Sequence, residues 1–116
     1  MSYKYAILLD NLNDNETSKQ ILEEILKKPQ YDVTLFCLSK ENIIPNPLAV
    51  FNIVDYFSWV GPTIITSYNT LEKALAYPAV GPKVIIGMLR YKDCITIPQF
   101  NLDVINTEIN KIISNE

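Results

Sequence analysis

Apolar residues recur in short clusters along this chain, and the spacing within the clusters alternates between that of strands and that of helices. The first run, YKYAILLD, is a short apolar segment that ends in Asp10, as a buried strand does where it enters a loop. A later run, YDVTLFCL, is rich in β-branched and aromatic residues, which favour strands. The last such run, CITI at residues 94–97, is followed by Pro98, which limits it to the edge of a sheet. We therefore predict strands over residues 3–10, 31–38, 63–66, 83–89 and 94–97.

Segments with helical spacing separate these runs. In the first of them, Thr17 with Gln20 fits a capping box, and its inward face consists of Ile21, Leu22, Ile25 and Leu26. Asn46 followed by Pro47 is a good start for a second helix, with Val50, Ile53, Val54 and Phe57 on one face. Asn69 is a suitable N-cap for a third. We predict helices over residues 17–28, 46–57, 69–76 and 101–114, the last with Leu102, Ile105, Ile109 and Ile112 or Ile113 facing inward.

Strands that alternate with helices imply right-handed crossovers and a largely parallel sheet that is covered on both faces. The chain has 116 residues, 48% of them apolar, which suits a single hydrophobic core. We expect one three-layer α/β domain over residues 1–116. It should be Rossmann-like or flavodoxin-like, with a mostly parallel sheet of four to five strands.

Composition narrows the choice of partners and of location. The formal net charge is −3 and the ten basic residues are scattered, so we expect no nucleic-acid partner. No apolar run reaches the length of a signal sequence or of a bilayer span, so we expect no membrane partner and a cytoplasmic protein. Cys37 and Cys94 have no histidine to complete a metal set, so we interpret them as reduced core thiols and expect no metal and no cofactor.

Short polar residues follow the first and third predicted strands. In parallel α/β sheets, ligands bind outside the carboxyl ends of the strands, where the strand order reverses. If the two strands are neighbours there, one crevice contains Asp10, Asn11, Asn13, Thr66, Ser67 and Asn69. Such residues suit a phosphate, a carboxylate or a sugar hydroxyl. They also cap turns and helices without any ligand, and this second interpretation stays open.

Specific catalytic and nucleotide motifs are absent from the sequence. Glycine occurs only at positions 61, 81 and 87, so there is no GxGxxG and no Walker loop. The loop DNLNDNE has oxygen ligands but places Glu16 where a calcium loop needs glycine. Without histidine the usual Ser or Cys triads have no base. Asp10 could act as a base at the strand end, or simply cap the next segment.

The densest aromatic stretch is FNIVDYFSWVGP, residues 51–62. Part of it must pack against the sheet, because aromatic side chains dominate the cores of small domains. Tyr56 and Trp59 are candidates for a protein-partner surface. Their burial in the core is the alternative.

The order of YAILLDN, YDVTLFCL, WVGPTIITSYNTLEKAL and PKVIIGML resembles the N-terminal Rossmann-like lobe of two-lobed glycosyltransferases, and more closely small glycosyltransferase-like proteins of tailed phages that infect cyanobacteria. The similarity covers about the first ninety residues. It implies that the strand TIITS lies beside the first strand, with Thr66 and Ser67 in an acceptor crevice. In that family the donor nucleotide is held chiefly by a second lobe, which these 116 residues do not include.

From the residues and the resemblance together we expect a non-catalytic or accessory binding domain, viral in origin and located in the host cytoplasm. Its partner would be a protein or a small polar ligand. One alternative is a sugar transferase, or a subunit of one, that uses Asp10 and the region of Ser67. Another is a structural subunit of a homo-oligomer that associates through the strand at residues 94–97 or the aromatic segment at 51–59.

Overall fold

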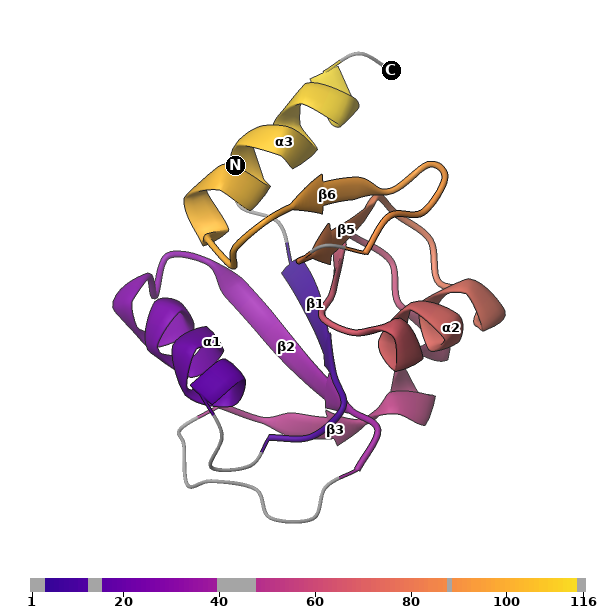
Figure 1. Ribbon diagram of the computed structural model, residues 1–116, viewed down its shortest axis with the longest axis horizontal. Coiled ribbons are helices and arrows are strands. Elements are labelled where there is room, and N and C mark those ends of the chain that lie inside the picture. Colours follow the sequence, from indigo (N-terminus) through magenta and orange to yellow (C-terminus); the bar gives the residue numbers. More distant parts are fainter. Residues whose placement is uncertain (1–3, 13–15, 40–47, 88, 115–116) are drawn as a thin grey trace.

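The computed structural model describes residues 4–12, 16–39, 48–87 and 89–114, which form a layered α/β domain (Figure 1). Its strands and helices are β1 (Lys4–Leu9), α1 (Glu16–Lys27), β2 (Asp32–Cys37), β3 (Val50–Asn52), the 3-10 helix η1 (Ile53–Ser58), β4 (Thr63–Ile65), α2 (Tyr68–Ala76), β5 (Lys83–Ile86), β6 (Ile95–Ile97) and α3 (Leu102–Ser114). A helix separates most successive strands, although among the described residues β3 follows β2, and β6 follows β5, without one. The predicted α/β class is confirmed.

All strands of the described residues belong to one parallel sheet in the order β3-β2-β1-β4-β5-β6. Strands β2 and β3 lie on one side of β1, and β4, β5 and β6 follow in order on its other side. Ile7 of β1 lies opposite Leu35 of β2 on one side and Ile64 of β4 on the other. The predicted adjacency of the first strand and the strand at 63–66 is therefore confirmed. The sheet has six strands instead of four to five, and its order is compatible with a Rossmann-like fold.

Side chains of the sheet alternate between two hydrophobic clusters, one on each face. On one face α1 and α3 pack over the strands through Ile21, Leu22, Ile25, Leu102, Ile105 and Ile109. On the other face η1 and α2 contribute Ile53, Tyr56, Leu71 and Ala74. Cys37 belongs to the first cluster, whereas Cys94 packs against the second, so the sheet separates these two cysteines.

The predicted helix over residues 46–57 is wrong for residues 48–52, which are not helical, whereas residues 53–57 belong to the 3-10 helix η1. Asn46 and Pro47 lie outside the described residues. Val50–Asn52 forms the edge strand β3, whose Phe51 lies opposite Phe36 of β2. The side chain of Asn52 accepts a hydrogen bond from the backbone of Val54 at 3.0 Å and so starts η1. The apolar spacing that suggested a helix arises from a short strand joined to a 3-10 turn.

Helix α1 differs from its prediction at two points. It begins at Glu16, so Thr17 lies in the first turn instead of at the cap, and Gln20 donates a hydrogen bond to the Glu16 carboxylate. Ile21, Leu22 and Ile25 are buried as predicted, whereas Leu26 is 49% exposed. None of the helices in the described ranges is long and apolar enough to cross a membrane.

The amino-terminal edge of the sheet is closed by two loops that touch. Val60 and Val80 form a bridge, and the backbone of Gly61 donates to the carbonyl of Val80 at 2.7 Å. Gly81 has a φ of +141°, and a Cβ there would lie 2.1 Å from the carbonyl oxygen of Gly61. Only glycine permits this approach, so the two loops are fixed against each other.

Candidate functional site

Two adjoining hollows lie along the carboxyl-terminal edge of the sheet, next to α1. The smaller, of about 240 Å³, is lined by Leu9, Asp10, Asn11, Thr17, Ser18 and Thr66. The larger, of about 440 Å³, is lined by Thr17, Gln20, Ile21, Glu23, Glu24, Lys27, Thr66, Ile86, Pro98, Gln99 and Phe100. Because both include Thr17 and Thr66, we treat them as one site, called the crevice below. It opens where the strand order reverses between β1 and β4, the usual ligand position in such folds.

Ser67 joins the crevice to the start of α2. Its hydroxyl donates to a carboxylate oxygen of Asp10 at 2.9 Å and accepts from the backbone of Thr70 at 3.1 Å. The backbone of Ser67 in turn donates to the hydroxyl of Thr70 at 3.0 Å, which completes a capping box. The Ser67 hydroxyl is therefore occupied as both donor and acceptor. Its role toward the crevice is to hold the Asp10 carboxylate in place.

Thr66 is placed to contact a ligand more directly, because it lines both hollows. Its hydroxyl donates to the carbonyl of Leu8 at 2.7 Å, a bond that crosses from β4 to β1. The proton of this hydroxyl is thus committed to the sheet, while its oxygen retains acceptor capacity. Thr66 can accept a hydrogen bond from a ligand without losing its contact to Leu8.

Of the residues predicted for this site, the structure brings Asp10, Asn11 and Thr66 together in the lining, with Ser67 bound to Asp10. Asn69 is exposed in the first turn of α2 and is not part of the lining, and Asn13 lies outside the described residues. The prediction that Asn69 caps α2 is wrong, because Ser67 is the N-cap. The capped-turn interpretation is therefore confirmed for Ser67 and Thr70, whereas ligand binding in the crevice stays a prediction.

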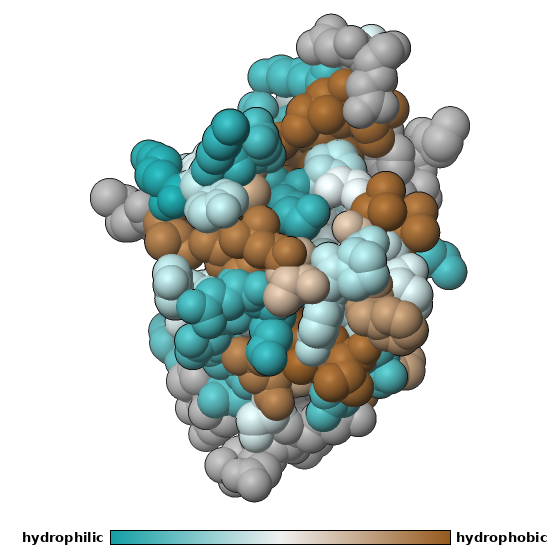
Figure 2. Space-filling view, turned by 90° about the vertical axis from the view of Figure 1, so that its right-hand side faces the viewer, coloured by the Kyte–Doolittle hydropathy of each residue, from teal (hydrophilic) through white to brown (hydrophobic). Residues whose placement is uncertain are grey.

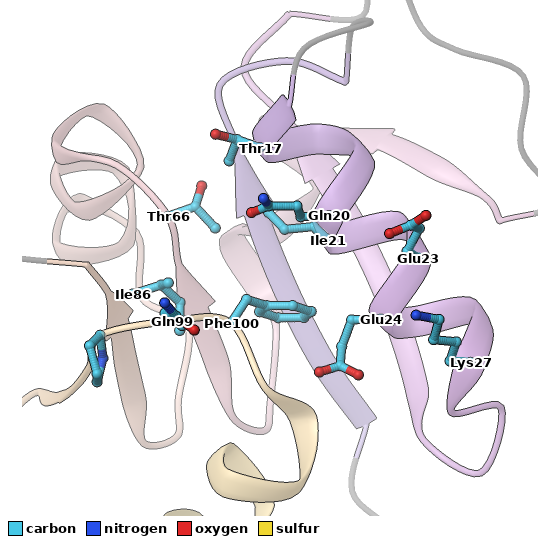
Figure 3. Close-up of a pocket in the computed structure, with 11 residues that line it drawn as sticks. Thr17, Gln20, Ile21, Glu23, Glu24, Lys27, Thr66, Ile86, Gln99 and Phe100 are labelled. Carbon is cyan, nitrogen blue, oxygen red and sulfur yellow. The ribbon is translucent and has the colours of Figure 1, made fainter.

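Sequence reasoning missed the two longer walls of the crevice, which face each other in Figure 3. One wall is the side of α1 that carries Thr17, Gln20 and Glu24. The other is the segment between β6 and α3, from which Phe100 extends toward α1. The α1 wall had a signal, since positions 17, 20, 24 and 27 share one side of a helix. The position of Phe100 had none, because it depends on how β6 and α3 pack.

Acidic groups outnumber basic groups around the crevice. Asp10, Glu23 and Glu24 line it together with a single lysine, Lys27, among the described residues. Glu16 adds a further acid in the first turn of α1, where an anionic ligand would otherwise gain from the helix dipole. The electrostatic potential of the site therefore disfavours phosphates and carboxylates.

An ionic cluster links the far end of α1 to the first turn of α3. The ammonium of Lys28 lies 3.0 Å from the Glu24 carboxylate and 2.8 Å from that of Asp103. The hydroxyl of Tyr31 donates to the other oxygen of Asp103. The hydrogen bonds that Asp103 accepts from Lys28 and Tyr31 hold the pKa of its carboxylate below the ordinary value, and the bond from Lys28 has the larger effect. The Asp103 carboxylate in turn raises the pKa of Lys28 and of Tyr31.

The aromatic segment does not form the surface that was considered for it. Tyr56 is fully buried, and its hydroxyl bonds with that of Thr63 at 2.7 Å. Burial raises the pKa of Tyr56, and the bond to Thr63 partly opposes this. Trp59 is half-buried against Phe36, with ring centroids 5.6 Å apart, and donates to the carbonyl of Pro62. Core packing is thus the correct interpretation of Tyr56, and it accounts for most of Trp59.

The apolar side chains that this segment does expose are Phe51, Val54, Phe57 and Val60, each more than two-fifths accessible. On the side of the molecule that carries α2, apolar surface lies in separate patches divided by hydrophilic residues (Figure 2).

Within the part of the chain that the structure describes, no three His, Cys, Asp or Glu side chains gather as a metal ion would require.

Comparison with protein-family models, with curated proteins and with solved structures finds no match to this chain. The crevice therefore has to be interpreted from its own chemistry.

Proposed function

We propose that this chain is an accessory binding domain that holds a small, uncharged polyhydroxy ligand, such as a sugar, in the crevice. The observation that carries the proposal is the combination of one aromatic ring with hydroxyl and amide side chains at the point where the strand order reverses. A relation in fold to a glycosyltransferase lobe is part of this proposal, and the adjacency of β1 and β4 supports it.

The lining suits the two chemical faces of a sugar ring. Phe100 is half-buried and extends toward α1, so one side of its ring can pack against the C–H groups of a sugar. Across the crevice, Gln20 and Thr66 point toward each other, with Gln99 beside Phe100 (Figure 3). Amides donate and accept hydrogen bonds, which matches ligand hydroxyls that also do both.

The same lining argues against the anionic ligands considered at the outset. A phosphate would meet the carboxylates of Asp10, Glu23 and Glu24. The sequence also has no glycine between β1 and α1 to let the backbone approach a pyrophosphate. A neutral ligand avoids the repulsion and can still donate hydrogen bonds to these carboxylates.

A sugar transferase is the second candidate, because of the position of Asp10. Its carboxylate lies at the carboxyl end of β1 and is oriented by Ser67, as a general base would have to be. Such an activity needs a donor in addition to the acceptor. The test therefore has to include a nucleotide sugar and to measure turnover as well as binding.

The experiment is a titration of the ¹⁵N-labelled protein with glucose, mannose and N-acetylglucosamine, and with uridine diphosphate and inorganic phosphate as anionic probes. We expect a sugar to shift the amides of Thr66 and Phe100, and we expect the anions to leave them in place. Phe100→Leu keeps an apolar side chain but loses the flat ring, and should weaken binding about two- to tenfold, since one aromatic contact contributes about 0.5–1.5 kcal/mol. Phe57→Leu, an exposed phenylalanine on the opposite face, is the matched control.

A titration in which none of the sugars shifts these amides, or in which phosphate binds more tightly, would contradict the proposal. Release of uridine diphosphate from a nucleotide sugar, lost in Asp10→Asn, would favour the transferase over the accessory domain.

A further inference from the structure

We propose that Lys28, Tyr31 and Asp103 form a strap that sets the width of the crevice, and that Lys28 and Asp103 are positioning residues for its ligand. The statement about a ligand rests on the function proposed above. The statement about crevice width does not.

The two walls of the crevice belong to α1 and to residues 98–100, which lie far apart in sequence. The second wall leads directly into α3, because Asn101 follows Phe100 and caps that helix. The side chain of Asn101 accepts from the backbone of Asp103 at 3.0 Å and of Val104 at 3.2 Å. A displacement of the first turn of α3 would therefore carry Phe100 with it.

The strap connects this turn to the opposite wall. Asp103 uses both carboxylate oxygens, one toward Lys28 and the other toward Tyr31. Lys28 follows the last residue of α1, and its ammonium also contacts Glu24, whose side chain lines the crevice. Figure 3 shows the Glu24 carboxylate on the side of α1 that faces the chain leading from Phe100 into α3. The chain of contacts thus runs from one wall to the other.

The same helix offers a matched comparison. Glu108 pairs with Lys111 at 3.3 Å, within α3 and on its surface. Glu108→Gln changes the charge of α3 by the same amount as Asp103→Asn but breaks no link to α1. A difference between the two changes therefore reports on the link and not on charge.

The test uses the full chain labelled with 4-fluorophenylalanine. Its four phenylalanines give separate ¹⁹F resonances, and Phe100→Leu assigns the one in the crevice. We expect Asp103→Asn to shift the Phe100 resonance while that of Phe36, on the other face of the sheet, stays in place. Tyr31→Phe removes only one of the contacts and should shift Phe100 less, in the same direction. Glu108→Gln should shift neither resonance.

A second measurement concerns the ligand. For whichever of glucose, mannose and N-acetylglucosamine binds most tightly, Asp103→Asn should weaken binding about two- to fivefold, and Glu108→Gln should have no effect. A Phe100 resonance that stays in place in Asp103→Asn would overturn the strap. Equal sugar affinity in the wild type and Asp103→Asn would overturn its positioning role. A shifted Phe100 in a protein that binds none of the sugars would retain the strap and refute the proposed function.

Discussion

The hydroxyl of Ser67 donates a hydrogen bond to the carboxylate of Asp10 at 2.9 Å, across a separation of 57 residues in sequence. The same hydroxyl oxygen accepts from the backbone of Thr70 and so begins α2. One small side chain therefore both starts a helix and orients the acid at the end of β1. Its removal should affect the stability of the domain and the geometry of the crevice together.

Ser67→Ala should lower the free energy of unfolding by about 1–2 kcal/mol. It removes the N-cap of α2 and also the hydrogen bond that the Asp10 carboxylate accepts from Ser67. Asn69→Ala is the control from the same turn, and should change stability by less than about 0.5 kcal/mol because Asn69 is exposed and caps nothing. Urea denaturation measures both changes in the free energy of unfolding, provided that its dependence on urea concentration has the same slope in each variant as in the wild type. A larger loss in Asn69→Ala would mean that the helix begins elsewhere.

Leu22→Asp should prevent folding, because it places a charge in the core beneath α1, where Leu22 is 6% exposed. Leu26→Asp changes the same residue type one turn later, at a position that is 49% exposed, and should leave the fold intact. Circular dichroism and size-exclusion chromatography distinguish the two outcomes. A folded Leu22→Asp variant would show that another face of α1 meets the sheet.

Tyr56 and Thr63 should behave as a coupled pair. Tyr56→Phe and Thr63→Val each leave a buried hydroxyl without its partner, and each should cost about 1–2 kcal/mol. The double variant removes both hydroxyls and should cost clearly less than the sum. Thermal or urea unfolding of the four proteins closes the cycle. Additive losses would indicate that the two hydroxyls do not depend on each other.

Acid should weaken the contact between α1 and α3. Because its neighbours lower the pKa of Asp103 in the folded state, this carboxylate contributes stability at pH values above its ordinary pKa of 3.8. That contribution disappears as the pH falls through the lowered folded-state value. Asp103→Asn should therefore be less stable than the wild type at neutral pH, and the two stability curves should converge in strong acid. Parallel curves down to the lowest pH would contradict this assignment.

The layered α/β arrangement could be predicted from sequence because its signals are local and repeated. The spacing of Ile21, Leu22 and Ile25 predicts a helix that packs on a sheet through one face, and these residues are buried as expected. The position of β4 beside β1 was also anticipated, which brought Asp10 and Thr66 to one site. The buried face of α1 is determined by one helix alone, whereas the adjacency of β1 and β4 was expected from the resemblance.

The errors arise where distant contacts decide between local alternatives. Ser67 and Asn69 are both good caps, and the bond from Ser67 to Asp10 is formed with a strand 57 residues away. Val50–Asn52 is too short to show an alternating pattern and becomes a strand through its register with β2. Phe100 lines the crevice only because β6 and α3 hold the intervening segment over the sheet. Local propensity contains none of this information.

The close contact between Gly61 and Gly81 has a consequence for protein engineering. It fixes the loops that precede β4 and β5 at the edge of the sheet opposite the crevice, and it leaves no room there for even one methyl group. Variation in those loops is therefore costly, whereas the exposed side chains of Gln20, Glu23 and Gln99 can change with little effect on folding. A library that randomises these crevice positions and retains both glycines should yield mostly folded members, from which new ligand preferences can be selected on an unchanged frame.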